Sequence, residues 1–131
     1  ADLMTNVNLE EEVADSISCL HAIEHFGLGR YGDSINIDGH IIGIINLIKM
    51  LKKGGLLYIS FPIGTSDEVH FNAHRIFHPK SILEYQEVRE KLELINFDYV
   101  DDKGDLHLQV SVNSVDNELK YGCGIYTFKR F

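Results

Sequence analysis

Two histidines and a glutamate lie within five residues of one another, directly after an apolar run. The run at residues 17–20 is followed by His21, Glu24 and His25. Imidazole and carboxylate groups act as general acids or bases, and both bind divalent metals. An isolated histidine is usually half-buried and bonded to backbone, but three candidate ligands within five residues weaken that interpretation. Because residues 17–20 are β-prone or apolar, the sequence predicts a functional site at the end of a strand.

The same residues also match a metallopeptidase motif. His21-x-x-Glu24-His25 reproduces the H-x-x-E-H string of inverted zinc peptidases, in which a helix places both histidines on one face and the glutamate acts as base. That chemistry requires a helix through the motif, whereas β-prone residues precede it and three glycines follow between positions 27 and 32. The third zinc ligand of that family is also not evident. We therefore disfavour the peptidase interpretation.

Length and composition predict a single folded domain. The chain has 131 residues, 44% hydrophobic and 24% charged. Its formal charge of −8 disfavours a broad nucleic-acid-binding surface, which needs clustered lysine and arginine. The longest apolar stretch, residues 41–50, is too short to cross a membrane, and no signal peptide is visible. Two cysteines without metal or disulfide spacing indicate a reducing, cytoplasmic setting, with Cys19 as a small buried hydrophobe.

The first half of the chain has the pattern of a strand, a helix and a second strand. We expect strands at residues 17–21 and 56–61, with Pro62 closing the second, and a helix at 40–51 that ends at Gly54-Gly55. Such a crossover makes the two strands parallel, so His21 and residues 62–64 should meet at one edge. Residues 27–33 match G-x-G-x-x-G, but no helix follows, so we interpret the match as accidental.

The second half predicts antiparallel strands. Residues 69–79, with histidines at 70, 74 and 78, are interpreted as a loop and residues 80–88 as a short helix. Strands are expected at 92–100, 106–112 and 121–128, with a turn at 101–104. The expected fold is therefore α/β, with parallel strands followed by antiparallel C-terminal strands.

Several motifs resemble the C-terminal half of class I S-adenosylmethionine-dependent methyltransferases. The strand ending in His-Ala-Ile-Glu-His, the helix ending in Leu-Lys-Lys-Gly-Gly and the apolar strand after it follow the order of that superfamily. The strings Gly-Leu-Gly-Arg-Tyr-Gly-Asp at 27–33 and Phe-Asn-Ala-His-Arg-Ile-Phe at 71–77 are similar to a more particular family of methyltransferase-like proteins. The resemblance covers nearly the whole chain.

The resemblance implies part of a Rossmann-like sheet. Residues 1–131 would form one methyltransferase-like domain with the fourth to seventh of seven strands, the last antiparallel. The complete domain would bind S-adenosylmethionine through a loop in an N-terminal half that this chain lacks. In the chain itself, cofactor contacts are expected at Asp2 and Leu3 and, at the end of the first strand, at Cys19 and Leu20.

The resemblance also implies roles for the residues after the first strand. Some relatives hold a divalent metal with Glu-x-x-Glu-His and a later histidine, which corresponds here to His21, Glu24, His25 and His74. A histidine in place of the first glutamate favours a softer ion such as Zn²⁺ or Mn²⁺ over Mg²⁺; in other relatives Glu-His at this place binds no metal. His21 or His74 would act as the base. Acceptor contacts are expected at Arg30, Tyr31, Asn72 and Arg75, the last of which holds an anionic acceptor or, alternatively, forms a surface ion pair.

Two functions follow from these expectations. The first is a methyltransferase-like enzyme acting on a small, oxygen-bearing acceptor, incomplete or inactive as this chain alone. The second is a catalytically silent α/β module used for assembly, because a sheet that lacks its first strands leaves the strand at Ile17 as an open edge. In that case the chain pairs with another copy or with a missing N-terminal half.

Overall fold

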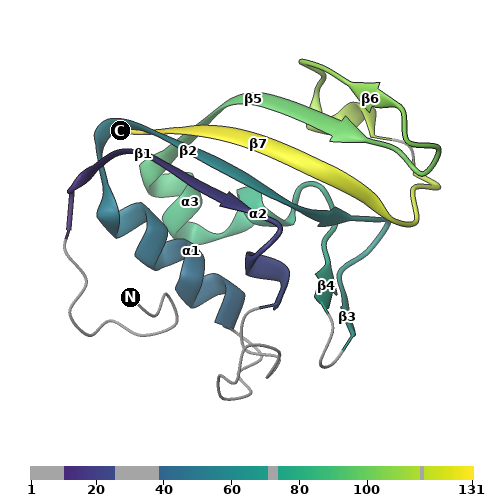
Figure 1. Ribbon diagram of the computed structural model, residues 1–131, viewed down its shortest axis with the longest axis horizontal. Helices are drawn as coiled ribbons and strands as arrows, with labels where there is room; N and C mark the ends of the chain where they lie inside the picture. The colour runs from purple at the N-terminus through teal and green to yellow at the C-terminus, as the bar shows by residue number, and fades with distance from the viewer. Residues whose placement is uncertain (1–10, 26–38, 71–73, 116) are drawn as a thin grey trace.

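A computed structural model describes residues 11–25, 39–70, 74–115 and 117–131 (Figure 1). Its centre is a five-stranded sheet with the order β1-β2-β7-β5-β6. The strands are β1 (Ala14–Leu20), β2 (Leu51–Ile63), β5 (Leu92–Val100), β6 (Leu106–His107) and β7 (Gly122–Arg130). The helices are α1 (Gly39–Met50), α2 (Ser81–Glu84) and α3 (Gln86–Lys91), with short 3₁₀ turns η1 (Ile23–His25) and η2 (Val112–Ser114). A hairpin, β3 (Glu68–His70) and β4 (His74–Ile76), completes the described elements.

The predicted parallel crossover is confirmed. β1 pairs with β2 in parallel, from Ser16 opposite Leu56 to Leu20 opposite Ser60. The predicted helix is α1, whose apolar positions Ile44, Leu47 and Ile48 follow helical spacing and are buried. It ends earlier than expected, because β2 begins at Leu51 and the glycine pair lies within the irregular start of that strand.

Pro62 lies inside β2 and does not close it as predicted. Its carbonyl oxygen accepts a hydrogen bond from the Phe77 amide and therefore points away from β7. The nitrogen of the same strand residue points to the same side as its carbonyl oxygen, so it faces away from β7 as well. Beyond Ser60 the neighbouring β1 has ended, and a residue without an N–H group is therefore tolerated at this point of the ladder. The strand continues to Ile63 as a result.

The predicted antiparallel C-terminal part is confirmed, with corrections to three segments. β7 lies between β2 and β5 and is antiparallel to both. β6 has two residues in place of the expected seven, because Gln109 adopts a φ of 52° that breaks the extended conformation. The predicted helix at 80–88 is divided into α2 and α3 by the extended Tyr85. Residues 68–70 and 74–76 form a hairpin where a loop was expected.

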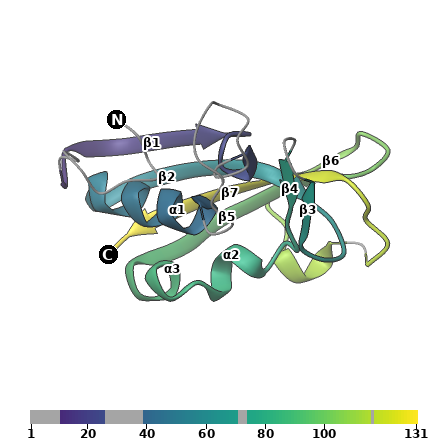
Figure 2. The same ribbon diagram turned by 90° about the horizontal axis from the view of Figure 1, so that it is seen from below.

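The three helices lie on one face of the sheet and cover its core (Figures 1 and 2). Alternate residues of β2 and β7 point into this layer and are almost fully buried, among them Leu57, Ile59, Phe61, Tyr126 and Phe128. We call this the helix face. The intervening residues of these strands, among them Tyr58, Cys123 and Ile125, belong to the opposite face, as does Leu20 of β1, and no described helix covers that face. None of the described helices is long and apolar enough to span a membrane.

Candidate functional site

The end of β1 delivers the histidine that the sequence singled out. Leu20 is the last residue of the strand, and the His21 amide donates to the Ser60 carbonyl oxygen at 2.9 Å, which ties this point to β2. His21 then adopts a φ of 50°, a left-handed conformation that turns the chain out of the sheet and into η1. Its side chain is 52% exposed. His21 therefore lies at the carboxyl ends of the parallel strands, the edge at which α/β sheets bind ligands.

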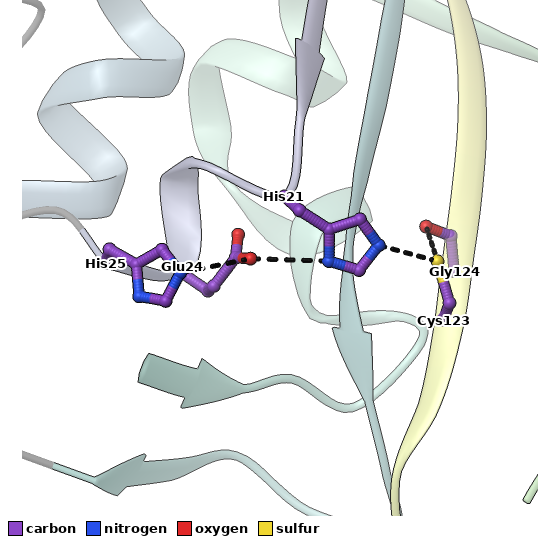
Figure 3. Close-up of polar contacts among 5 residues, drawn as sticks. All are labelled: His21, Glu24, His25, Cys123 and Gly124. Atoms are coloured by element: carbon purple, nitrogen blue, oxygen red, sulfur yellow. Dashed lines mark hydrogen bonds and ion pairs between the residues drawn. The ribbon is translucent and has the colours of Figure 1, made fainter. Parts of the chain in front are cut away.

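η1 brings Glu24 between the two histidines (Figure 3). Its Oε1 atom lies 3.4 Å from His21 Nδ1 and 3.7 Å from His25 Nε2. The Glu24 side chain is only 2% exposed, and no described residue provides a hydrogen-bond partner for its second oxygen, Oε2. The structure thus brings three of the predicted site residues, His21, Glu24 and His25, together.

Cys123 on β7 is a further member of the group. Its Sγ lies 3.0 Å from His21 Nε2, so the imidazole bridges Glu24 and the thiol (Figure 3). Glycines flank Cys123 because β7 has no room for larger side chains at these two positions. A Cβ on Gly122 would lie 2.6 Å from the Val100 carbonyl oxygen, and one on Gly124 would lie 2.8 Å from the Tyr126 ring. Sequence reasoning missed Cys123, because its contact depends on the insertion of β7 beside β2. The one feature of the sequence that could have pointed to Cys123 is its position between two glycines in an apolar strand.

Burial governs the protonation of these groups. It raises the pKa of the Glu24 carboxyl, and the neighbouring His25 and His21 imidazoles oppose that shift. Burial and the Glu24 charge also raise the pKa of the Cys123 thiol. The same causes raise the pKa of Cys19 to about 11, and its side chain is 7% exposed in the core. The prediction that Cys19 is a small buried hydrophobe is therefore confirmed.

A separate hollow of about 230 Å³ lies between β3, β4 and the start of α1. Its lining includes the Arg75, His40 and Tyr85 side chains, and His40 Nε2 lies 3.1 Å from the Tyr85 hydroxyl. Arg75 is 2% exposed, so the surface ion pair considered from sequence is wrong. Burial and Asp67 raise the pKa of Tyr85 to about 12, against the opposing charge of Arg75. The hollow thus combines a buried cation with a neutral phenol, an imidazole and the carboxyl groups of Asp67 and Glu68.

The remaining predicted site residues divide into described and undescribed ones. β4, which begins at His74, packs against η1, so the backbone brings this histidine's strand to the His21 group. Leu20 is 59% exposed on the face opposite the helices. Cys19 packs into the core with 7% of its surface exposed, and its predicted cofactor contact stays a prediction. The expected contacts at Asp2, Leu3, Arg30, Tyr31 and Asn72 and the His74 side chain lie outside the described residues.

The metal prediction finds no support in the described part of the chain. Within residues 11–25, 39–70, 74–115 and 117–131, no group of three or more histidine, cysteine, aspartate or glutamate side chains is arranged to hold an ion. Zinc requires ligand atoms at about 2.0–2.3 Å in tetrahedral geometry. Here the carboxylate separates the two imidazoles, so the group has the arrangement of an oriented base.

Comparisons with known proteins give a family match and several structural matches. The model of the family described as "Caenorhabditis protein of unknown function, DUF268" matches residues 1–121. Among solved structures, that of the [4+2]-cyclase SpnF is similar, with a TM-score of 0.61 and 12% identity over 98% of this chain and 54% of the cyclase chain. A search of curated proteins gave no match. The two chains share an α/β fold, and this chain spans about half of the cyclase's length.

Proposed function

We propose that this chain, which belongs to the DUF268 family, is the acceptor-binding half of an S-adenosylmethionine-dependent methyltransferase-like protein that acts on a small, oxygen-bearing acceptor. The observation that carries the proposal is the His21–Glu24 pair at the carboxyl ends of β1 and β2. The methyltransferase-like fold supports it. Bound at this edge, the cofactor would supply an electrophilic methyl group, with the exposed Leu20 side chain as an apolar contact.

His21 is suited to act as the base in this reaction. Its Nδ1 atom lies 3.4 Å from Glu24 Oε1, so a proton on Nδ1 would face the buried carboxylate, which would stabilise the imidazolium that forms when Nε2 accepts a proton. An acceptor hydroxyl that displaces the Cys123 thiol from Nε2 and loses its proton there becomes a better nucleophile as the methyl group arrives. Glu24 acts through His21 and is therefore a positioning residue.

The hollow beside β4 is the site at which we expect an anionic or phenolic acceptor to bind. The Arg75 guanidinium is buried at its wall, and its charge would attract a carboxylate or phenolate on the acceptor, while Asp67 and Glu68 of the same lining oppose that attraction. His40 and Tyr85 provide polar atoms beside it. Because β4 packs against η1, an acceptor seated in the hollow would approach the His21 edge.

Calorimetry with S-adenosylmethionine tests the proposal. The cofactor is titrated into this chain and into the longest natural form of the protein, each as wild type and as His21→Gln. The longest form should release or absorb heat with a single-site isotherm, and His21→Gln should retain binding because the histidine acts on the acceptor. The absence of any binding heat from the longest wild-type form would overturn the proposal.

A second function, assembly, has its own supporting observation. β1 is an edge strand that pairs only with β2 among the described residues, and Leu20 is exposed on it. Its free backbone groups favour the addition of a strand from another copy or from an N-terminal half. This proposal predicts self-association, and sedimentation that shows only monomers at micromolar concentration would count against it.

A further inference from the structure

We propose that Cys123 is a covalent attachment site for soft carbon electrophiles of the α,β-unsaturated carbonyl class, with His21 as the base that activates it. The two residues come from strands 102 positions apart, yet Cys123 Sγ lies 3.0 Å from His21 Nε2. The contact is within hydrogen-bonding range for sulfur and nitrogen. It forms the nucleophile–base pair that covalent catalysis and thiol modification require.

Glu24 fixes the imidazole in the useful orientation. Its Oε1 lies 3.4 Å from Nδ1, so the proton of a neutral imidazole is held on Nδ1 and the Nε2 lone pair faces the thiol. A buried carboxylate with an oxygen that no described residue hydrogen-bonds is costly for folding. Packing does not explain this placement, whereas the orientation of His21 does.

Exposure distinguishes Cys123 from the second cysteine. Cys123 is half-buried on the face opposite the helices, next to the half-exposed His21. Cys19 is buried in the core on the helix face. An electrophile in solvent therefore reaches one thiol of the two.

The reaction is balanced without a further reactant. His21 Nε2 accepts the thiol proton, and the sulfur electron pair forms a C–S bond to the β-carbon of the electrophile. The π electrons of the C=C bond move toward the carbonyl to give an enolate, and the imidazolium returns its proton to the α-carbon. Every atom of the electrophile is retained, and nothing is oxidised or reduced.

The surroundings favour base-assisted attack over a permanently ionised thiolate. Burial raises the pKa of Cys123, so the thiol is protonated at neutral pH and depends on His21. The titratable groups around the pair are Glu24 and His25 on η1, Cys19 on β1 and Tyr126 on β7. Cys19 and Tyr126 have pKa values raised by burial and stay neutral, so Glu24 and His25 set the charge beside His21.

Acrylamide, an α,β-unsaturated amide, is the probe that tests the inference. Adducts are located by peptide mass spectrometry and their rates followed on the wild-type chain, His21→Gln, Glu24→Gln and the matched control His107→Gln, whose histidine pairs with Asp101 elsewhere. We expect one adduct, on Cys123. At pH 7 its rate should fall at least about tenfold in His21→Gln and should stay within about twofold in the control.

A pH profile separates base assistance from simple thiol ionisation. In the wild type the rate should change little between pH 7 and 9, because transfer of the thiol proton to His21 accompanies the attack and requires no prior ionisation of the thiol. In His21→Gln it should climb steeply with alkalinity, as an unassisted thiol does. Glu24→Gln should fall between the two. An adduct on Cys19 alone, no adduct, or an unchanged rate in folded His21→Gln would overturn the inference, whatever the outcome with S-adenosylmethionine.

Discussion

Glu24 lies in an environment that disfavours its charge. Its carboxylate is almost fully buried, within 3.4 and 3.7 Å of two imidazole nitrogens. Burial raises its pKa more than the imidazoles lower it. A carboxyl group kept at such a position, at the end of a parallel strand, is a recognised mark of functional sites. The cluster of His21, Glu24 and His25 was predictable from spacing alone, because one tight turn after a strand is enough to bring them together.

The raised pKa of Glu24 predicts a specific pH dependence of stability. In the folded chain the carboxyl binds a proton more tightly than its ordinary value of 4.5, so the free energy of unfolding falls as pH rises from that value through the folded pKa. Glu24→Gln cannot titrate and should gain stability relative to the wild type over this interval. Thermal unfolding between pH 4 and 8 measures the difference. Glu87→Gln on α3 is the control, and a Glu24→Gln advantage that is flat or shrinks with rising pH would contradict the account.

At the scale of elements, the periodicity of apolar residues predicted the helices and strands that are covered on one face. α1, β5 and β7 were predicted because their buried positions repeat with the period of a helix or a strand. β6 and the α2–α3 break were not, because each depends on the backbone angles of one residue, Gln109 or Tyr85. The Cys123 contact was also beyond prediction from sequence, since it requires β7 to insert between β2 and β5.

The central strand β7 is anchored by one buried hydroxyl. Tyr126 is fully buried and donates to the Pro79 carbonyl oxygen at 2.6 Å, which links the sheet to the segment before α2. Tyr126→Phe leaves that carbonyl without its partner and should lower the free energy of unfolding by about 1–3 kcal/mol. Chemical denaturation measures the loss. Tyr58→Phe, on the opposite and exposed face, should change it by less than about 0.5 kcal/mol; equal effects would show that the buried hydrogen bond contributes nothing specific.

At the scale of the whole molecule, the sheet of the described residues ends at β1, the strand to which we propose that a neighbour adds. β1 has one partner among the described residues, while the structurally similar cyclase chain is about twice as long. The parallel end of the sheet therefore carries both the His21 group and the edge on which a further strand would extend it. Site and assembly surface are adjacent in this account.

A charge on the edge strand should interfere with pairing. Leu20→Lys places an ammonium group at a position that is 59% exposed in the described structure, and lysine on an edge opposes strand addition. If copies associate through β1, sedimentation should show the wild type shifting to larger species with concentration and the variant staying monomeric. Leu108→Lys, exposed beyond β6, is the matched control. Identical association of all three proteins would exclude β1 as the contact.

The most direct test of the central claim is to locate where S-adenosylmethionine acts on the chain. Hydrogen exchange is measured by mass spectrometry on the longest natural form, with and without the cofactor, because bound ligand slows amide exchange at its site. We predict protection at residues 20–25 and 62–65, where the carboxyl ends of β1 and β2 meet, and none at residues 101–107. Protection confined to other regions, or no protection at saturating cofactor, would contradict the account.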